Sequence, residues 1–151
     1  MKSAITNVSI IPDVAMVTVN NIPNGISNIS TIFEEMSRLD LNLDMISQTA
    51  PYKDKLNISF TLSQDDLDKV VLSTGKFKKI SGGISTDING NNAKVILYGE
   101  EMKNESGVAS RIFKMFSDIG VDIKLITTSE CEISCLIDSR DTERVKKAFQ
   151  S

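Results

Sequence analysis

Few residues of this chain have the types and the spacing that catalysis requires. The 151 residues include no histidine, so the commonest general base and metal ligand is missing. The two cysteines, Cys131 and Cys135, lie in a predicted strand, where positions four apart are separated by roughly 13 Å. A disulfide needs Cα atoms within about 7 Å, and two thiols without histidine make a poor zinc site. We interpret both as small core residues of a cytoplasmic protein.

Clusters of charge are interpreted as solvated surface. Three pairs of adjacent carboxylates are expected on exposed helix faces or loops: Glu34–Glu35, Asp65–Asp66 and Glu100–Glu101. The basic cluster "KFKK" (76–79) is too small to outweigh the formal net charge of −3, and nucleic-acid binding favours a basic face. No apolar run approaches the roughly 18 residues of a membrane span. The sequence therefore predicts no catalytic residue, no metal, no nucleic-acid partner and no membrane partner.

Two junctions between a strand and a helix are better candidates for binding. They are "NNIPNGISNIS" (20–30) and "GEEMKNESGVAS" (99–110). A helix start presents free N–H groups and a partial positive charge, which suits a carboxylate. Gly25 and Gly107 would let a ligand approach the backbone closely.

Polar residues of a predicted strand complete this candidate site. In "LNLDMISQ" (41–48), Asp44 carries a carboxylate that suits an ammonium group, as does Asp122 in the related segment "VDIKLITT" (121–128). The amide of Gln48 could contact a ligand side chain. A ligand with one carboxylate and one ammonium group is a zwitterion, so these partners indicate an amino acid.

An internal repeat organises the elements that position these residues. Three pairs of segments align, at offsets of 78, 80 and 75 residues: 15–21 with 93–99, 29–47 with 109–127, and 57–70 with 132–145. In each copy, apolar residues first alternate as in a strand and then recur at helical spacing. They alternate again in two further segments, and a short helix ends the copy. Ser27 and Ser106 are predicted N-caps of the first helices, and Ser63 of a second helix.

The fold expected from this order is α+β and ferredoxin-like. Residues 82–88 are predicted as a fourth strand of the first copy, which gives βαββαβ. The second copy lacks a fourth strand, whereas "AITNVSII" (4–11) precedes the first. A sheet without that strand exposes an edge, so we predict that the N-terminal strand completes the second copy. The predicted domains are 14–90, and 91–151 together with 1–13.

Several segments resemble the tandem ACT regulatory region of aspartate kinase (aspartokinase). They are "AMVTVNNIPN", "IFEEMSRLDLNLDMISQ", "NISFTL", "AKVILYGEEMK" and "LITTSECEISCLID", of which "TSE-x-x-IS" (128–134) is the most specific. The resemblance extends from about Ile5 to Phe149. It implies two ferredoxin-like ACT domains, no cofactor and no catalytic activity, because the kinase domain that binds aspartate and ATP is not part of this chain.

The resemblance also implies effector sites for aspartate-pathway amino acids, chiefly lysine and threonine, where two ACT domains meet. One pocket would use Asn24, Ser27, Asn28, Ile29, Asp44, Gln48, Asp122 and Ile123. The other would use Asn104, Ser106, Gly107, Val108, Ala109, Thr128, Asn42 and Leu43.

The leading hypothesis is therefore an allosteric amino-acid sensor of aspartate kinase. It would act in the cytoplasm as a homodimer, together with a kinase catalytic domain or subunit. One alternative is a ligand-free ACT scaffold that dimerises the kinase. A small ferredoxin-like enzyme, such as an acyl-phosphate hydrolase, is disfavoured because that chemistry needs an arginine in an anion-binding loop.

Overall fold

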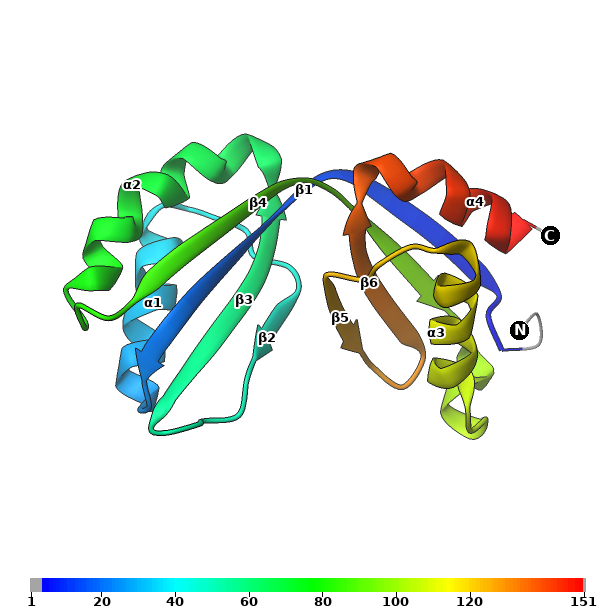
Figure 1. Ribbon diagram of the computed structural model, residues 1–151, viewed down its shortest axis with the longest axis horizontal. Coiled ribbons are helices and arrows are strands. Elements are labelled where there is room, and N and C mark those ends of the chain that lie inside the picture. Colours follow the sequence, from blue (N-terminus) through cyan, green and yellow to red (C-terminus); the bar gives the residue numbers. More distant parts are fainter. Residues whose placement is uncertain (1–3, 151) are drawn as a thin grey trace. The chain divides into compact units, whose positions relative to one another are not determined.

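The computed structural model describes residues 4–150, which divide into two compact units (Figure 1). The central unit is Val14–Gly90, and the terminal unit combines residues 4–13 with residues 91–150. Two long strands, β1 (Asn7–Pro23) and β4 (Ser85–Tyr98), contribute residues to both units. The strands follow one another in the order β2-β3-β1-β4-β6-β5.

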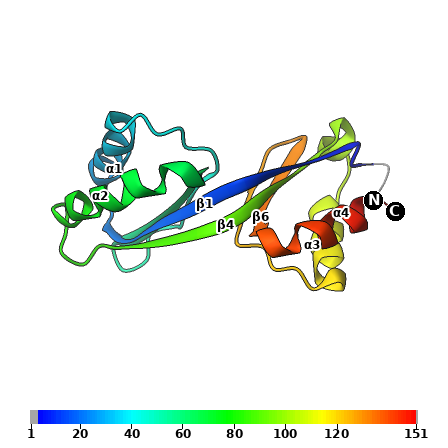
Figure 2. The same cartoon turned by 90° about the horizontal axis from the view of Figure 1, so that it is seen from above.

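The central unit places two helices beside part of this sheet, as Figure 2 shows. Its further elements are α1 (Ile26–Arg38), β2 (Ile46–Gln48), β3 (Lys55–Ser63), the 3-10 turn η1 (Gln64–Asp66) and α2 (Leu67–Lys78). Strand β3 pairs antiparallel with both β1 and β2. The core consists of alternate strand residues and one helix face, among them Val17, Val19, Ile58, Phe60, Ile32, Met36, Val70 and Phe77. This confirms the predicted alternation and helical spacing.

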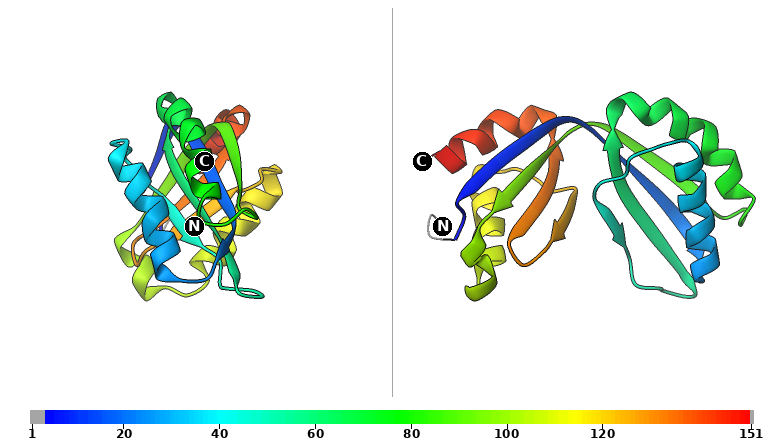
Figure 3. Two further views of the ribbon diagram at one scale, coloured as in Figure 1. Left: turned by 90° about the vertical axis from the view of Figure 1, so that its left-hand side faces the viewer. Right: turned by 180° about the vertical axis from the view of Figure 1, so that it is seen from behind.

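The terminal unit repeats this arrangement, with α4 packed against α3 (Figure 3). Its further elements are η2 (Glu100–Asn104), α3 (Val108–Ile119), β5 (Leu125–Thr128), β6 (Glu132–Asp138), η3 (Ser139–Asp141) and α4 (Thr142–Gln150). Strand β6 pairs antiparallel with β4 and β5. The core again combines strand and helix residues, among them Val95, Leu97, Ile112, Phe116, Cys135 and Val145.

The N-terminal segment contributes to the terminal unit. The Thr6 N–H donates to the Tyr98 carbonyl oxygen at 2.8 Å, and Ala4 is only 1% exposed. Ile5, Val8 and Ile10 pack against the core of this unit. The segment therefore adds both backbone pairing and apolar contact there.

The prediction of separate strands is wrong in two places, because each of these pairs of predicted strands belongs to a single strand. Residues 4–11 and 15–21 contribute to β1, and residues 82–88 and 93–99 contribute to β4. Asp13 (φ 57°) and Asn91 (φ 59°) lie inside these strands in the left-handed region. Asp and Asn enter this region more readily than other non-glycine residues, so the backbone can turn there while the strand continues.

The predicted strands 41–48 and 121–128 are shorter in the structure. Only Ile46–Gln48 (β2) and Leu125–Thr128 (β5) are strand. Before β2, the Asp44 N–H donates to the Thr61 carbonyl, while the Met45 N–H donates to the Thr61 hydroxyl at 2.9 Å. Because the Thr61 N–H in turn donates to the Met45 carbonyl at 3.0 Å, Asp44 and Met45 both lie opposite Thr61. This extra residue interrupts the regular register before β2. Burial still alternates, since Leu41 and Met45 are buried.

The predicted serine caps are wrong for the first helix of each unit. The N-cap residues are Gly25 for α1 and Gly107 for α3, and neither helix has a side-chain cap. Ser27 lies inside the first turn of α1, and Ser106 precedes Gly107. The cap at Ser63 is confirmed for η1, where its hydroxyl accepts from the Asp65 N–H.

Glu35 is not the solvated surface residue that the sequence predicted. Its side chain is 11% exposed and accepts hydrogen bonds from Arg38 (2.6 Å), Ser73 (3.1 Å) and Lys76 (3.3 Å). Arg38 contributes most to lowering the pKa of Glu35 to about 2, with Lys76 and Ser73 acting in the same direction and burial opposing them. Because Ser73 and Lys76 belong to α2, this carboxylate joins α2 to α1.

Candidate ligand-binding cavity

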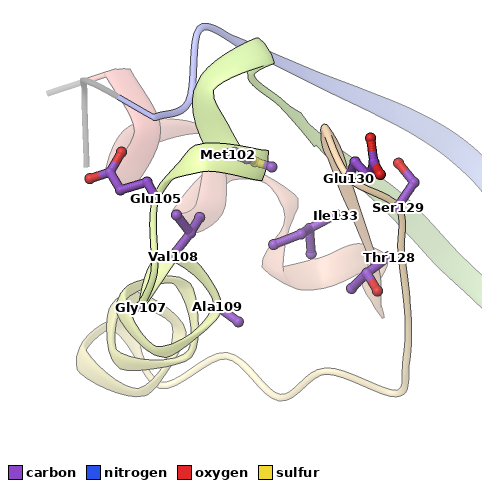
Figure 4. Close-up of a pocket in the computed structure, with 9 residues that line it drawn as sticks. All are labelled: Met102, Glu105, Gly107, Val108, Ala109, Thr128, Ser129, Glu130 and Ile133. Carbon is purple, nitrogen blue, oxygen red and sulfur yellow. The ribbon is translucent and has the colours of Figure 1, made fainter.

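A cavity of about 300 Å³ lies in the terminal unit, between the start of α3 and the turn that connects β5 to β6 (Figure 4). Its lining comes from η2, from the first residues of α3 and from the two strands. The lining residues are Met102, Glu105, Gly107, Val108, Ala109, Thr128, Ser129, Glu130 and Ile133.

The start of α3 provides backbone donors on one side of the cavity. Gly107 adopts φ 79°, a left-handed conformation that glycine adopts without steric cost. The first helical hydrogen bond runs from the Arg111 N–H to the Gly107 carbonyl. The N–H groups of Val108 and Ala109 lie before that bond and have no partner within the helix. They present a partial positive charge that suits an anion.

The turn after β5 provides polar groups on the opposite side. Thr128 pairs with Ile133 across the two strands, and the Ser129 N–H donates to the Glu132 carbonyl at 2.8 Å. These bonds hold the turn in place while Thr128, Ser129 and Glu130 stay exposed. The hydroxyl and carboxylate groups of the turn are therefore accessible to a ligand.

Buried apolar side chains form the base of the cavity. Met102, Val108 and Ile133 are each less than one-tenth exposed and belong to the core of the terminal unit. Figure 4 shows Val108 and Ile133 on opposite sides of the space, with Met102 above them. These side chains suit the apolar part of a small ligand.

The charged side chains of the lining are two carboxylates, one just before the start of α3 and one in the turn after β5. Glu105 and Glu130 are acidic, and none of the nine lining side chains is basic. Glu105 already accepts a 2.8 Å hydrogen bond from Arg111. Backbone donors at the start of α3 and the Glu130 carboxylate of the opposite turn match the two charges of a zwitterion.

Catalytic groups are not gathered at this cavity. The lining contains no cysteine, lysine or histidine, and burial raises the pKa of the nearby core thiol of Cys135 to about 12. Within residues 4–150, no three His, Cys, Asp or Glu side chains are arranged to hold a metal ion. Over the same residues, no helix combines the length and the apolar character that crossing a membrane requires.

The structure brings together four residues of the second predicted pocket: Gly107, Val108, Ala109 and Thr128 all line the cavity. Asn104 instead donates to Glu101, and Ser106 is exposed beside Gly107. Asn42 and Leu43 belong to the central unit, where Leu43 packs against the core.

Four of the residues predicted for the first pocket lie just before or within the first turn of α1. The Asn24 N–H donates to the Asp54 carbonyl at 2.9 Å, and the Asn28 amide donates to the Pro23 carbonyl at 2.8 Å. Ser27 is exposed in the first turn, and Ile29 packs against the core of the central unit.

Four further residues of that predicted pocket are spread over both units. Asp44 and Gln48 are exposed, just before β2 and at its end. Asp122 and Ile123 lie between α3 and β5 in the terminal unit, outside the lining of the cavity.

Five lining residues were missed from sequence: Met102, Glu105, Ser129, Glu130 and Ile133. Ser129 and Glu130 directly follow Thr128 in the stretch "TSE-x-x-IS", so the motif itself pointed to them. Met102 and Ile133 gave no separate signal, because their apolar character is that of any core residue.

Known proteins similar to this chain share its fold and its sequence pattern. An ACT domain model matches residues 95–151. The aspartokinase of Bacillus sp. strain MGA3 is 28% identical over 91% of the chain. The structure of the regulatory subunit of aspartate kinase from Thermus flavus is 23% identical, with a TM-score of 0.87 over 97% of both chains. A structure of aspartokinase alpha and beta subunits is 27% identical, with a TM-score of 0.83 over 98% of this chain and 100% of that one.

The extent of these matches differs between whole kinases and regulatory subunits. The chain covers 34% of the Bacillus aspartokinase, but nearly all of the Thermus regulatory subunit. The matched part is therefore the regulatory portion.

Proposed function

Because the chain is an aspartokinase regulatory-subunit-like region with an ACT domain, we propose that it binds an aspartate-pathway amino acid and thereby regulates an aspartate kinase. Lysine and threonine are the first candidates. The observation that carries this proposal is the cavity at the start of α3, with backbone donors facing exposed polar groups. We further propose that the central and terminal units are the two ACT domains.

The proposed pose follows from the charges around the cavity. The ligand carboxylate accepts from the N–H groups at the start of α3, where no side chain caps the helix. The ligand ammonium group faces the Glu130 carboxylate, and the side chain contacts Met102 and Ile133. Thr128 is near enough to the same space to hydrogen-bond the ligand.

Regulation requires that the amino acid distinguish two states of the protein. A ligand shifts an equilibrium only by its difference in affinity for those states. We propose that the states belong to an assembly of this chain, as a homodimer, with an aspartate kinase catalytic domain or subunit. The predicted effector contributions of Asn42, Leu43 and the first-pocket residues stay predictions, as does a cytoplasmic location.

Thermal unfolding with added ligands tests this function. Lysine, threonine and methionine would each be added at millimolar concentration, with the corresponding amino-acid amides as controls that lack the carboxylate. A ligand at a hundredfold excess over its Kd stabilises the folded state by about 2.7 kcal/mol. We expect a rise in Tm with at least one amino acid and none with its amide. No rise with any of them would favour a ligand-free scaffold.

A further inference from the structure

An acidic side chain lies close to the place where the ligand carboxylate is proposed to bind. Glu105 lines the cavity and precedes Gly107, the N-cap residue of α3, by two positions. Its side chain is only 33% exposed, so solvent and salt screen its charge incompletely. An unpaired carboxylate here would repel the ligand carboxylate and would itself suit the free N–H groups of the helix start. The proposed site therefore requires that the charge of Glu105 be compensated and its carboxylate kept away from these donors.

The side chain of Arg111 meets both requirements. Its Nη2 atom donates to the Glu105 Oε1 atom at 2.8 Å, which pairs the acid with a positive charge. Figure 4 shows the Glu105 side chain directed away from the space between Val108 and Ile133. Arg111 belongs to α3 itself, since its N–H donates to the Gly107 carbonyl at 3.1 Å. The helix that provides the backbone donors thus also holds the acid.

The guanidinium of Arg111 lies against the protein and does not extend freely into solvent. Its Nε atom is buried and has no hydrogen-bond partner among the described residues 4–150. A buried donor that is left unpaired costs free energy. The hydrogen bond to Glu105 therefore keeps the guanidinium in a position that leaves another of its donors unsatisfied, so the chain accepts a cost in order to hold this acid.

The internal repeat shows that the fold does not need this ion pair. At the 80-residue offset, the residue equivalent to Arg111 is Thr31, whose hydroxyl donates to the Ser27 carbonyl within α1 at 2.9 Å. Glu105 lies between segments aligned at offsets of 78 and 80, so its equivalent lies within 25–27, where no residue is charged. The first copy forms the same helix without the acid or the arginine. The pair therefore belongs to the cavity of the terminal unit and not to the repeated architecture.

We propose that Arg111 is a positioning residue for ligand binding in this cavity. By pairing with Glu105, it compensates the acid and holds it away from the N–H groups of Val108 and Ala109, so that the start of α3 stays open to the ligand carboxylate. Without Arg111, the Glu105 carboxylate competes with the ligand as an internal anion. This inference rests on the proposed function, because it gives Arg111 a role at the same site.

Calorimetric titration of the full chain with lysine, threonine and methionine tests this role by a double-mutant cycle. Arg111→Gln should weaken binding about five- to tenfold, whereas Glu105→Gln should stay within threefold of the original. The double variant should return to within threefold of the original, because the competing acid is gone. An arginine that only supports the fold predicts the opposite, since removing its partner as well cannot restore affinity. A double variant as weak as Arg111→Gln, or an Arg111→Gln variant within twofold of the original, would overturn the proposal.

A matched ion pair and a change of salt complete the test. Lys114→Gln breaks the 3.2 Å pair with Asp118 on the exposed surface of α3 and should leave affinity within twofold. In about 1 M NaCl, where charges are screened beyond roughly 3 Å, the deficit of Arg111→Gln relative to the original should shrink to less than threefold. A deficit that salt does not reduce would show a structural loss and contradict the role of Arg111. If the original chain binds none of the three amino acids, the proposed function fails as well, whereas equal binding by all variants overturns only the role of Arg111.

Discussion

Arg111 donates a 2.8 Å hydrogen bond to the carboxylate of Glu105 across the start of α3. Glu105 lines the cavity, but its charge is already compensated by this guanidinium. Glu130 also lines the cavity and is exposed. The two acids therefore differ in what they can offer a ligand.

The first prediction separates these two acids. Glu130→Gln removes the carboxylate that faces the ligand ammonium group, and a charge-assisted hydrogen bond is worth about 1.5–3 kcal/mol. We expect amino-acid affinity to fall about tenfold or more, measured by calorimetric titration. Glu105→Gln should reduce it less than threefold, and Glu143→Gln, on the exposed surface of α4, should leave it unchanged. Equal losses from Glu105→Gln and Glu130→Gln would contradict the proposed pose.

The second prediction concerns acid stability. Glu35 has a folded-state pKa of about 2, below its ordinary value of 4.5, because Arg38, Lys76 and Ser73 hydrogen-bond its charged form. Its ionised form therefore stabilises the fold above about pH 4.5, and this stabilisation is lost as the pH falls toward 2. Glu35→Gln should lower the urea midpoint at pH 7, with a difference from the original that shrinks steadily between pH 4.5 and 2.

The matched control for that experiment is the neighbouring residue. Glu34 is exposed on the same helix, where its carboxylate accepts a 3.3 Å hydrogen bond from the Ser30 hydroxyl one turn earlier. Glu34→Gln should change the midpoint little, and equally at pH 7 and pH 3. A difference for Glu35→Gln that stays constant with pH would show that its charge does not join α1 to α2.

The third prediction uses the repeat itself. Asp40 (φ 56°) and Gly120 (φ 68°) end α1 and α3 in the same left-handed conformation. The hydrogen bonds match, from Asp40 N–H to Ser37 and from Gly120 N–H to Ser117. A non-glycine residue in this conformation costs about 1–2 kcal/mol, and less for Asp. Asp40→Gly should raise the free energy of unfolding by about 0.5–1 kcal/mol, and Gly120→Asp should lower it by a similar amount, measured by urea denaturation. Changes of the same sign would exclude this explanation.

The fourth prediction tests the place of the N-terminal segment. A Cβ atom at Gly99 would overlap the carbonyl oxygen of Ala4, which is buried beside it. Gly99→Ala should displace residues 4–6 and expose the core of the terminal unit, which lowers the free energy of unfolding by about 2 kcal/mol or more. Hydrogen exchange at the Thr6 N–H, which donates to Tyr98, should become faster. Gly82→Ala, where the added atom meets nothing within 4 Å, is the control and should have little effect.

The parts of the fold that depend on local pattern were predictable from sequence. Ile32 and Ile112 recur at the 80-residue offset and are both fully buried, and the alternation of Leu56, Ile58 and Phe60 correctly predicted β3. Residues 4–11 and 15–21 were predicted as separate strands, but β1 includes parts of both and passes through Asp13 in a left-handed conformation. Local composition cannot distinguish such a turn within a strand from the end of one.

The parts that depend on distant partners were not predictable. From the sequence alone, Glu35 is one of two adjacent acids expected on the surface. Its hydrogen-bond partners Ser73 and Lys76 lie about forty residues later in the chain. At the cavity, the predicted helix start pointed to Gly107, and the resemblance to the ACT regulatory region implied Val108 and Ala109. Ile133 joins them only because β6 pairs with β5 next to Thr128, which is a consequence of tertiary structure.

Amino-acid binding in the cavity is tested most directly by two neighbouring variants. Ala109 lines the cavity, whereas Ser110 is exposed on the next position of α3 and does not. Ala109→Phe fills the cavity without entering the core, and Ser110→Phe adds the same side chain outside it. Calorimetric titration with the amino acid that raises the Tm should show at least a tenfold loss of affinity for Ala109→Phe and an unchanged affinity for Ser110→Phe. Equal affinity for the original chain and Ala109→Phe would contradict binding at the start of α3.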